Sequence, residues 1–268
     1  MDNTYIGADG LKYCKICGCA KQARINVPMR GERVVGIACK CIKEQQAAYA
    51  RYEEMDKRER ARRICFDGSN MSGWNFQTSN GNNPEIESIM KNYVQNFPEF
   101  KKQGKGLLLS GPVGTGKTYM AACVANALID SGYKALMTNF SSLINKIQGM
   151  WEGKQNYINS LNLYQLIVID DLGAERNSEY MQEQVFNIID ARYRSGLPMI
   201  ITTNLSTEEL KKPKDLSNTR IYDRILERCH PVKFSGGSIR REKIKESFYE
   251  TSEKLGSRRQ HEKYNMGG

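Results

Sequence analysis

The chain has 268 residues, 40% of them hydrophobic and 26% charged, and its mean hydropathy is −0.60. Such a composition belongs to a soluble globular protein with enough chain for one or two packed domains. It excludes a membrane-spanning protein, because no apolar run reaches the length of a span, and residues 1–5 lack the basic-then-apolar order of a secretion signal. We therefore expect a cytoplasmic protein with no membrane partner.

The net charge of +10 is concentrated at the two ends of the chain. Lys and Arg outnumber Asp and Glu by 14 to 8 in residues 1–66 and by 15 to 8 in residues 210–268, whereas residues 67–209 carry 11 against 14. Basic ends suit a nucleic acid or an acidic protein as partner, since phosphate neutralisation dominates such affinity. A well-solvated surface has the same pattern, so charge alone leaves both interpretations open.

The first 66 residues contain two short cysteine clusters. In a cytosolic protein, such clusters indicate metal binding or free thiols rather than disulfides. We predict that Cys14, Cys17, Cys39 and Cys41 bind one tetrahedral Zn²⁺, with Cys19 as the reserve ligand. A group of buried or redox-active thiols is the alternative. Three solitary cysteines are expected in the core: Cys65, Cys123 and Cys229.

Residues 42–64 contain strong helix formers and no helix breaker, which predicts a charged connecting helix. Ala48, Tyr52 and Met55 form a thin apolar stripe on it, which would dock on a partner or pack against its own domain. From residue 67 to residue 84 the composition shifts to Gly, Ser and Asn, which predicts a linker and a domain boundary near residue 66. Its large apolar residues, Trp74 and Phe76, would enclose an adenine ring or pin the linker.

A glycine-rich segment stands between an apolar run, residues 106–110, and a helical pattern that follows it. It fits G-x-x-x-x-G-K-T, and strand, loop and helix are the order that a phosphate-binding P-loop requires. Lys117 would reach the outer phosphates of ATP, and the Thr118 hydroxyl would bind Mg²⁺. A chance glycine turn before a helix is the alternative. The expected nucleotide-binding residues are Gly111, Pro112, Val113, Gly114, Thr115, Gly116, Lys117 and Thr118.

Two carboxylates, Asp170 and Asp171, follow the apolar run of residues 166–169. Four apolar residues in a row predict a buried parallel strand, and the ligand sites of open α/β sheets lie at the carboxyl ends of strands. Asp170 would hold Mg²⁺, and Asp171 would orient or deprotonate the attacking water. An acidic pair that caps a helix is the alternative. Beside a complete P-loop, nucleotide hydrolysis explains the pair better.

Further strands are predicted at residues 134–138, 198–203 and 231–234, with helical patterns between them. Alternating strands and helices predict an α/β fold, in which helices cover both sides of a parallel sheet. The strand at 198–203 runs into Asn204, whose amide would help to hold the attacking water.

Arg220, Arg224 and Arg228 lie at i, i+4 and i+8 on one face of a predicted helix. An exposed arginine stripe is often only a solvated face. In an ATPase that assembles as a ring or spiral, such an arginine can instead reach the γ-phosphate bound by the neighbouring copy, where charge develops in the transition state.

From about residue 66 to residue 245, these motifs resemble, in order, those of the DnaC/DnaI-type replicative helicase loaders of the AAA+ superfamily. The cysteine-rich segment is similar to that of DnaI-like loaders, where a zinc module contacts the helicase. The resemblance implies a P-loop AAA+ core whose five-stranded parallel sheet has the order 5-1-4-3-2. It also implies self-assembly with ATP and the loading of a hexameric replicative helicase onto single-stranded DNA.

The resemblance implies roles for individual residues. Asn204 would be sensor 1, and Arg240 would be the sensor 2 arginine that acts within its own subunit. Arg224 would be the arginine finger, with Arg220 as the second choice. The second acid is Asp171 where most AAA+ proteins have Glu, and its shorter side chain implies slow, switch-like hydrolysis regulated by a partner or by DNA.

Loaders of this type carry a helical insertion that lines the path of single-stranded DNA. Residues 139–154 occupy that place in this chain. Phe140, Lys146 and Lys154 are candidate contacts, because aromatic stacking and backbone charge hold single strands without reading sequence. A core phenylalanine and ordinary surface lysines are the alternative.

We therefore expect a loader with an N-terminal cysteine-rich module (1–66), a linker (67–84), an ATPase domain (85–250) and a polar tail (251–268). A transposition accessory ATPase similar to IstB, which shares this core but binds duplex DNA and a transposase, is the alternative. The cysteine module favours the loader. A scaffold that binds ATP without useful turnover is a third possibility.

Overall fold

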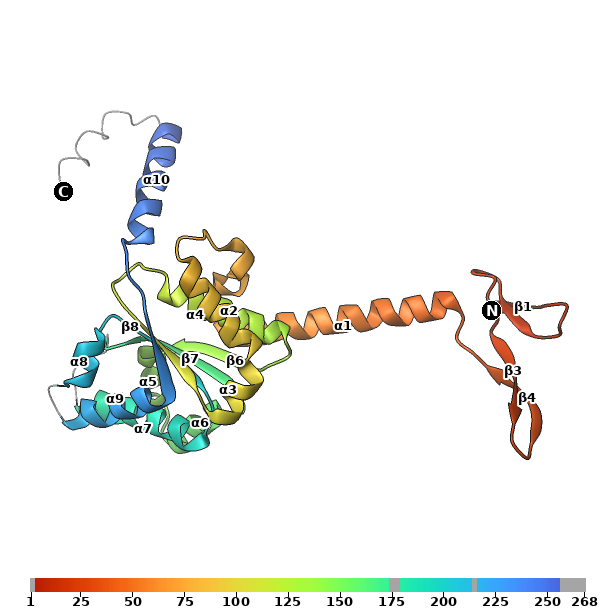
Figure 1. Ribbon diagram of the computed structural model, residues 1–268, viewed down its shortest axis with the longest axis horizontal. Coiled ribbons are helices and arrows are strands. Elements are labelled where there is room, and N and C mark those ends of the chain that lie inside the picture. The colour runs from red at the N-terminus through yellow and green to blue at the C-terminus, as the bar shows by residue number, and fades with distance from the viewer. Residues whose placement is uncertain (1–2, 174–178, 214–215, 256–268) are drawn as a thin grey trace. The chain divides into compact units, whose positions relative to one another are not determined.

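The computed structural model describes residues 3–173, 179–213 and 216–255. The chain divides into two compact units, residues 1–60 and 61–268 (Figure 1). Within the described residues, no helix combines the length and the apolar character needed to cross a membrane. Most of the tail expected from residue 251 lies outside the described residues, and its first four residues belong to the last helix, α10 (Ile239–Lys254).

The first unit consists of two antiparallel hairpins and most of a long helix. Strand β1 (Thr4–Ile6) pairs with β2 (Lys12–Cys14), and β3 (Gln22–Val27) pairs with β4 (Gly31–Gly36). Among the described residues of this unit, Cys14 and Cys39 are the buried ones. A unit with so little apolar core needs another source of stability, and metal ligation supplies it in small domains of this kind.

Helix α1 (Lys40–Phe66) runs past the boundary between the units, which lies between Arg60 and Ala61 rather than near residue 66 as predicted. Its last residues belong to the second unit, because Cys65 and Phe66 are buried in that core. Arg62 Nε also donates to Asn126 Oδ1 at 3.1 Å, and its guanidinium pairs with Asp130. The expected stripe of Ala48, Tyr52 and Met55 is exposed and does not pack on its own unit.

The second unit is built on a parallel sheet of five strands. The strands are β5 (Gly106–Ser110), β6 (Ala135–Asn139), β7 (Leu166–Leu172), β8 (Met199–Thr203) and β9 (Cys229–Lys233). Their order is β9-β5-β8-β7-β6. In chain order this is the fifth, first, fourth, third and second strand, which is the order expected above. Every residue of β5 and β8 is buried, as the central strands of a covered sheet require.

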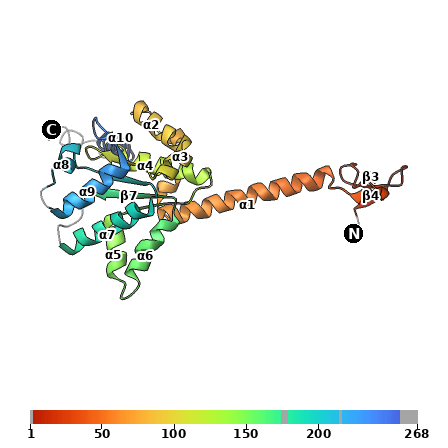
Figure 2. The same ribbon diagram turned by 60° about the horizontal axis from the view of Figure 1, so that its bottom comes forward.

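Helices cover both faces of this sheet (Figures 1 and 2). One core cluster joins the sheet to α2 (Pro84–Gln95), α3 (Phe97–Gln103) and α4 (Lys117–Asp130). The other joins it to α5 (Phe140–Gln148), α6 (Lys154–Ser160), α7 (Glu179–Ser195) and α9 (Leu216–Arg228). The remaining short helices are α8 (Thr207–Lys211) and the 3-10 turns η1 (Asn70–Gly73), η2 (Phe76–Thr78) and η3 (Leu161–Leu163). The predicted α/β class is therefore confirmed.

Residues 67–84 differ from the predicted linker, because they fold onto α4 through η1 and η2. Asn126 Nδ2 donates to the carbonyl of Met71 at 3.0 Å and to that of Trp74 at 2.8 Å. The Tyr119 hydroxyl donates to the carbonyl of Asn75 at 3.0 Å, and the Tyr119 ring lies 5.3 Å from that of Trp74. Side-chain hydrogen bonds from a helix thus order a segment whose composition is typical of loops.

Candidate functional site

The loop between β5 and α4 is a tight glycine turn. Gly111, Gly114 and Gly116 have φ values of 143°, 85° and 96°, which lie in the region that favours glycine. A Cβ at Gly114 would collide with Ser238, so the segment that leads into α10 packs directly against the loop. The N–H of Ile239 donates to the carbonyl of Gly114 at 3.0 Å. The loop therefore has the shape that lets backbone N–H groups face an anion at the start of a helix.

Lys117, the first residue of α4, is almost completely buried under this loop. Its Nζ donates to the carbonyls of Gly111 at 2.7 Å and Pro112 at 2.8 Å, and to Asn204 Oδ1 at 2.8 Å. Burial lowers the pKa of Lys117, whereas the nearby carboxylates of Asp171 and Asp170 act in the opposite direction. The structure thus brings together the lysine and the asparagine that the sequence analysis places in one site.

Thr118 and Asp170 meet beside that lysine. Thr118 Oγ1 donates to Asp170 Oδ1 at 3.0 Å, and Thr202 Oγ1 donates to the same oxygen at 2.5 Å. Burial raises the pKa of Asp170, and the hydrogen bond from Thr202 opposes that rise. A hydroxyl and a carboxylate at this spacing are the hard oxygen donors that suit Mg²⁺. The two predicted magnesium ligands therefore lie in position to share one ion.

A cavity of about 740 Å³ opens in front of the loop, within the size range of small-molecule sites. Asp171, Asn204 and Arg240 line it together with the loop residues from Val113 to Thr118. Trp74 lines it as well, and both Trp74 and Phe76 pack against the first core cluster. One cavity thus collects the predicted phosphate loop, the second acid, the sensor 1 asparagine and the sensor 2 arginine.

The arginines of α9 do not occupy equivalent positions. Arg224 donates from Nε to Asp190 Oδ1 at 2.9 Å, and its guanidinium lies 4.7 Å from the centre of the Phe186 ring. Arg228 lies 4.7 Å from the centre of the Tyr193 ring. Arg220 is exposed. Arg224, the expected finger, therefore pairs with Asp190 of its own subunit.

The region expected to line a DNA path forms α5, α6 and the turn between them. Phe140 is 1% exposed and belongs to the second core cluster, so the prediction that it contacts DNA is wrong and the core alternative is right. Lys146 and Lys154 are exposed. The sequence reasoning did not select Trp151, which is completely exposed in the turn. A tryptophan between Gly149 and Gly153, outside any helical pattern, was the available signal.

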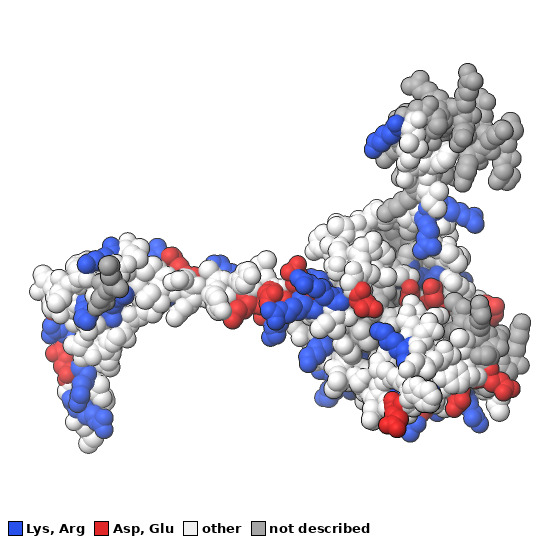
Figure 3. All heavy atoms as spheres, turned by 180° about the vertical axis from the view of Figure 1, so that it is seen from behind, with Lys and Arg blue, Asp and Glu red and all other residues white. Residues whose placement is uncertain are grey.

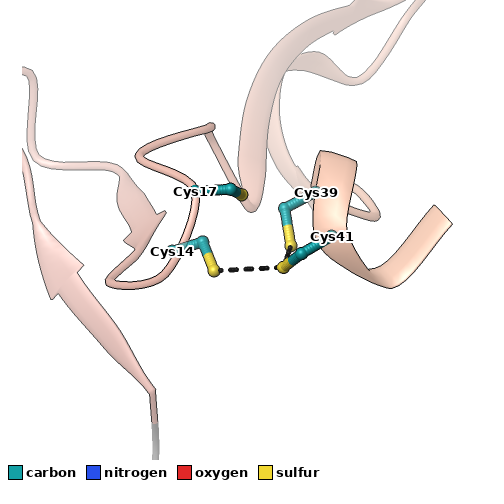
Figure 4. Close-up of side chains that lie close together, drawn as sticks. All are labelled: Cys14, Cys17, Cys39 and Cys41. Atoms are coloured by element: carbon teal, nitrogen blue, oxygen red, sulfur yellow. Dashed lines mark hydrogen bonds between the residues drawn. The ribbon is translucent and has the colours of Figure 1, made fainter. Parts of the chain in front are cut away.

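The four predicted metal ligands converge in the first unit (Figure 4). All Sγ atoms of Cys14, Cys17, Cys39 and Cys41 lie within 4.8 Å of one another. The Sγ atoms of Cys39 and Cys41 lie 3.2 Å apart, and those of Cys14 and Cys41 lie 3.5 Å apart. A tetrahedron with metal–sulfur bonds of about 2.3 Å has edges of about 3.8 Å. The cluster therefore has the size of a four-thiolate metal site.

Backbone N–H groups lower the pKa of Cys14 and Cys17, whereas contacts with the Cys39 and Cys14 thiols raise the pKa of Cys41. N–H groups of Cys41 and Cys19 lower the pKa of Cys17 to about 6. The Cys19 thiol itself is turned away, because its Sγ donates to the carbonyl of Cys17 at 3.6 Å. The reserve ligand thus lies outside the cluster, and the four first-choice cysteines form it.

The hairpin of β3 and β4 exposes side chains of two kinds. Lys and Arg gather along this hairpin in the view of Figure 3. Ile25, Val34 and the turn residue Met29 are exposed beside them. Arg24 Nη2 donates a hydrogen bond to the carbonyl of Asp9 at 2.8 Å. An exposed apolar and basic hairpin is a surface that can contact an acidic, partly apolar partner.

Comparison with known proteins relates this geometry to named relatives. The chain is 22% identical to "Replicative helicase loader DnaI" of Bacillus subtilis (strain 168), over 70% of this chain and 65% of the relative. It is 28% identical to "Replicative helicase loader DnaC" of Escherichia coli (strain K12), over 52% of this chain and 56% of the relative. The chain thus spans less than two thirds of the length of either relative.

Solved structures and a family model agree with the fold. "Crystal structure of the DnaC helicase loader" is similar with a TM-score of 0.51 and 25% identity, over 62% of this chain and 100% of that one. "Crystal Structure of the DnaI" is similar with a TM-score of 0.52 and 24% identity, over 63% of this chain and 91% of that one. The model described as "IstB-like ATP binding protein" matches residues 76–247, more than half of the chain. The chain therefore belongs to the family of IstB-like ATP binding proteins.

Proposed function

We propose that this protein is an ATP-dependent loader that places a hexameric replicative helicase on single-stranded DNA. The observation that carries the ATP-dependent part of the proposal is the convergence of Lys117, Asn204, Thr118 and Asp170 at one phosphate-binding loop. The names of the DnaI and DnaC relatives support the loading function. The cysteine cluster supports it against the IstB-like transposition alternative, for which no metal module is expected.

ATP would bind in the cavity, with its phosphates at the N-terminus of α4. Lys117 would neutralise the outer phosphates, and Thr118 and Asp170 would hold Mg²⁺, which supplies charge compensation when bound. Asp171 lines the cavity and would orient the attacking water together with Asn204. Because Asp reaches less far than Glu, we expect slow hydrolysis that a partner or DNA regulates.

Two arginines would stabilise the negative charge that develops on the γ-phosphate in the transition state. Arg240 lines the same cavity and would contact the γ-phosphate of its own subunit. Arg220 would act on the ATP of a neighbouring copy in a ring or spiral, because it is exposed while Arg224 is engaged by Asp190. Hydrolysis would then depend on self-assembly.

The first unit would contact the helicase. Zn²⁺ held by Cys14, Cys17, Cys39 and Cys41 would fix the hairpin of β3 and β4, whose exposed apolar and basic side chains would form the contact. The sulfur separations and the nearly coreless unit support this proposal. In the described part of the chain, no other group of three or more His, Cys, Asp or Glu side chains lies close enough together to hold a metal ion.

Single-stranded DNA would lie along α5 and α6 of the second unit. Lys146 and Lys154 would contact the phosphates, and Trp151 would stack on a base in the place that the sequence analysis gives to Phe140.

The test uses the full-length protein as bait in an extract of its host, with ATP and with a zinc chelator as separate conditions. Recovery of a replicative helicase, lost on chelation and in Cys14→Ser but kept in Cys19→Ser, would support the proposal. Recovery of a transposase together with duplex DNA binding would instead support the IstB-like alternative. A purified helicase must then show faster loading onto single-stranded circles when the protein and ATP are added.

A further inference from the structure

Two neighbouring threonines of β8, Thr202 and Thr203, are both completely buried, yet their hydroxyl groups have different partners. Thr203 Oγ1 donates to the carbonyl of Leu172 at 2.8 Å and accepts the N–H of Leu205 at 3.1 Å. These contacts only join one backbone segment to another. Thr202 therefore differs from its neighbour in what its hydroxyl holds.

Thr202 Oγ1 lies between the two predicted acids. It accepts the N–H of Asp171 at 2.9 Å and donates to Asp170 Oδ1 at 2.5 Å. Because a hydroxyl has one proton, and an N–H can only donate, the proton of Thr202 is directed at the Asp170 carboxylate. The same carboxylate also accepts from Thr118 on α4. Two hydroxyl groups thus fix its orientation.

The pairing of β7 with β8 explains why the Asp171 N–H needs a side-chain acceptor. Ile169 pairs with Ile201 and Leu172 pairs with Thr203, so Asp170 and Asp171 together stand opposite Thr202. Such a bulge leaves one residue outside the backbone ladder. In addition, Asp171 has φ 58°, an uncommon conformation for a residue with a side chain. The Thr202 hydroxyl accepts the Asp171 N–H that the bulge removes from the ladder.

The bulge also changes where the acids point. Successive side chains of a regular strand lie on opposite faces of the sheet. Here Asp171 lines the nucleotide cavity while Asp170 reaches Thr118 at the edge of the same site. A regular strand would direct one of the two carboxylates away from the nucleotide.

We infer that Thr202 is a positioning residue for ATP hydrolysis: its hydroxyl holds the bulge and orients Asp170, so that both carboxylates serve one Mg²⁺–nucleotide site. This inference rests on the proposed ATPase function and goes beyond it, because Thr202 acts through the two acids. Partners that orient a metal ligand in this way typically change metal affinity or activity 10–100-fold when they are removed.

The test compares Thr202→Val with Thr203→Val, which removes an equally buried hydroxyl of the same strand, and with Thr202→Ser, which keeps the hydroxyl. A fluorescent ATP analogue measures binding in EDTA and across a Mg²⁺ titration, and phosphate release measures turnover. For Thr202→Val we expect unchanged binding in EDTA, a Mg²⁺ requirement raised about tenfold or more, and a similar loss of kcat. Thr203→Val and Thr202→Ser should keep the wild-type Mg²⁺ requirement.

Equal Mg²⁺ requirements in Thr202→Val and Thr203→Val would overturn the inference, whatever their turnover. A wild-type protein that binds the analogue but releases no phosphate, even with DNA and helicase, would overturn the proposed hydrolysis instead. Should valine prevent folding, judged by thermal unfolding, Thr202→Cys takes its place, since a thiol fills similar space and hydrogen-bonds weakly. A raised Mg²⁺ requirement in Thr202→Cys would support the inference, and a Mg²⁺ requirement equal to that of the wild-type protein would contradict it.

Discussion

Two nitrogens of Arg224 contact a single carboxylate oxygen of Asp190: Nε donates a hydrogen bond at 2.9 Å, and Nη2 forms an ion pair at 2.8 Å. Asp190 is itself buried on α7, and the Arg224 guanidinium covers the Phe186 ring. A charged pair of this kind, partly removed from water, joins α9 to α7. Arg224 therefore has a structural role within its own subunit, whereas Arg220 is exposed.

We expect Arg224→Ala to lower the free energy of unfolding by about 2–3 kcal/mol, because it removes charge-assisted hydrogen bonds from a buried carboxylate. Urea denaturation measures this loss. Arg220→Ala should leave stability within about 0.5 kcal/mol of wild type, as is usual for an exposed position. It should nevertheless reduce assembly-dependent ATP hydrolysis by roughly a thousandfold. Full activity in Arg220→Ala, with loss only in a folded Arg224→Ala protein, would reverse the assignment.

Lys117→Ala should abolish ATP binding and hydrolysis. The ammonium group is buried under the phosphate loop, and its removal leaves two loop carbonyls and Asn204 without their donor. Fluorescence titration with an ATP analogue checks binding, and Lys102→Ala, an exposed lysine on α3, serves as the control. Wild-type affinity in Lys117→Ala would refute the P-loop assignment.

Cys14→Ser should abolish stoichiometric zinc, whereas Cys19→Ser should retain one zinc per chain. The Cys14 thiol belongs to the four-sulfur cluster, but the Cys19 thiol is directed at a backbone carbonyl. Elemental analysis of purified full-length variants gives the stoichiometry. Loss of zinc in both variants, or in neither, would mean that the four clustered thiols do not hold the ion.

Phe140→Ala and Trp151→Ala should have opposite consequences. Truncation of the buried Phe140 should lower the free energy of unfolding by about 3–5 kcal/mol, because a cavity remains in the core. Substitution of the exposed Trp151 should change the free energy of unfolding little. It should weaken single-stranded DNA binding by about 1–3 kcal/mol, the contribution of one stacked base. Thermal unfolding and fluorescence anisotropy with a labelled oligonucleotide distinguish them. Unchanged DNA affinity in Trp151→Ala would exclude the stacking role.

Features that depend on neighbouring residues in the sequence could be predicted. The phosphate loop, the acids that follow β7 and the asparagine that follows β8 each stand at the end of a short apolar strand. Parallel strands bring such ends to one edge of the sheet, so Lys117, Asp170 and Asn204 meet as expected. Local spacing likewise predicts the four cysteine ligands, and their sulfur atoms converge.

Features that depend on distant partners were not predictable. The composition of residues 67–84 indicates a linker, but Asn126 and Tyr119 on α4 order this segment by hydrogen bonds. The helical spacing of Arg224 matches that of a finger, but Asp190, 34 residues earlier, decides where its guanidinium lies. Likewise, nothing local reveals the bulge at Asp170 and Asp171, because it arises from the register of β7 against β8.

The near absence of a core in the first unit has a consequence for the cell. Cys14 and Cys39 are the buried residues among those described there, so burial of side chains contributes little to its folding. If the ion is the main source of stability, the folded fraction follows the concentration of free metal by mass action. Under zinc starvation this unit would unfold while the ATPase unit, with its own large core, stays intact. The proposed recruitment of a helicase would then respond to zinc supply before ATP binding is affected.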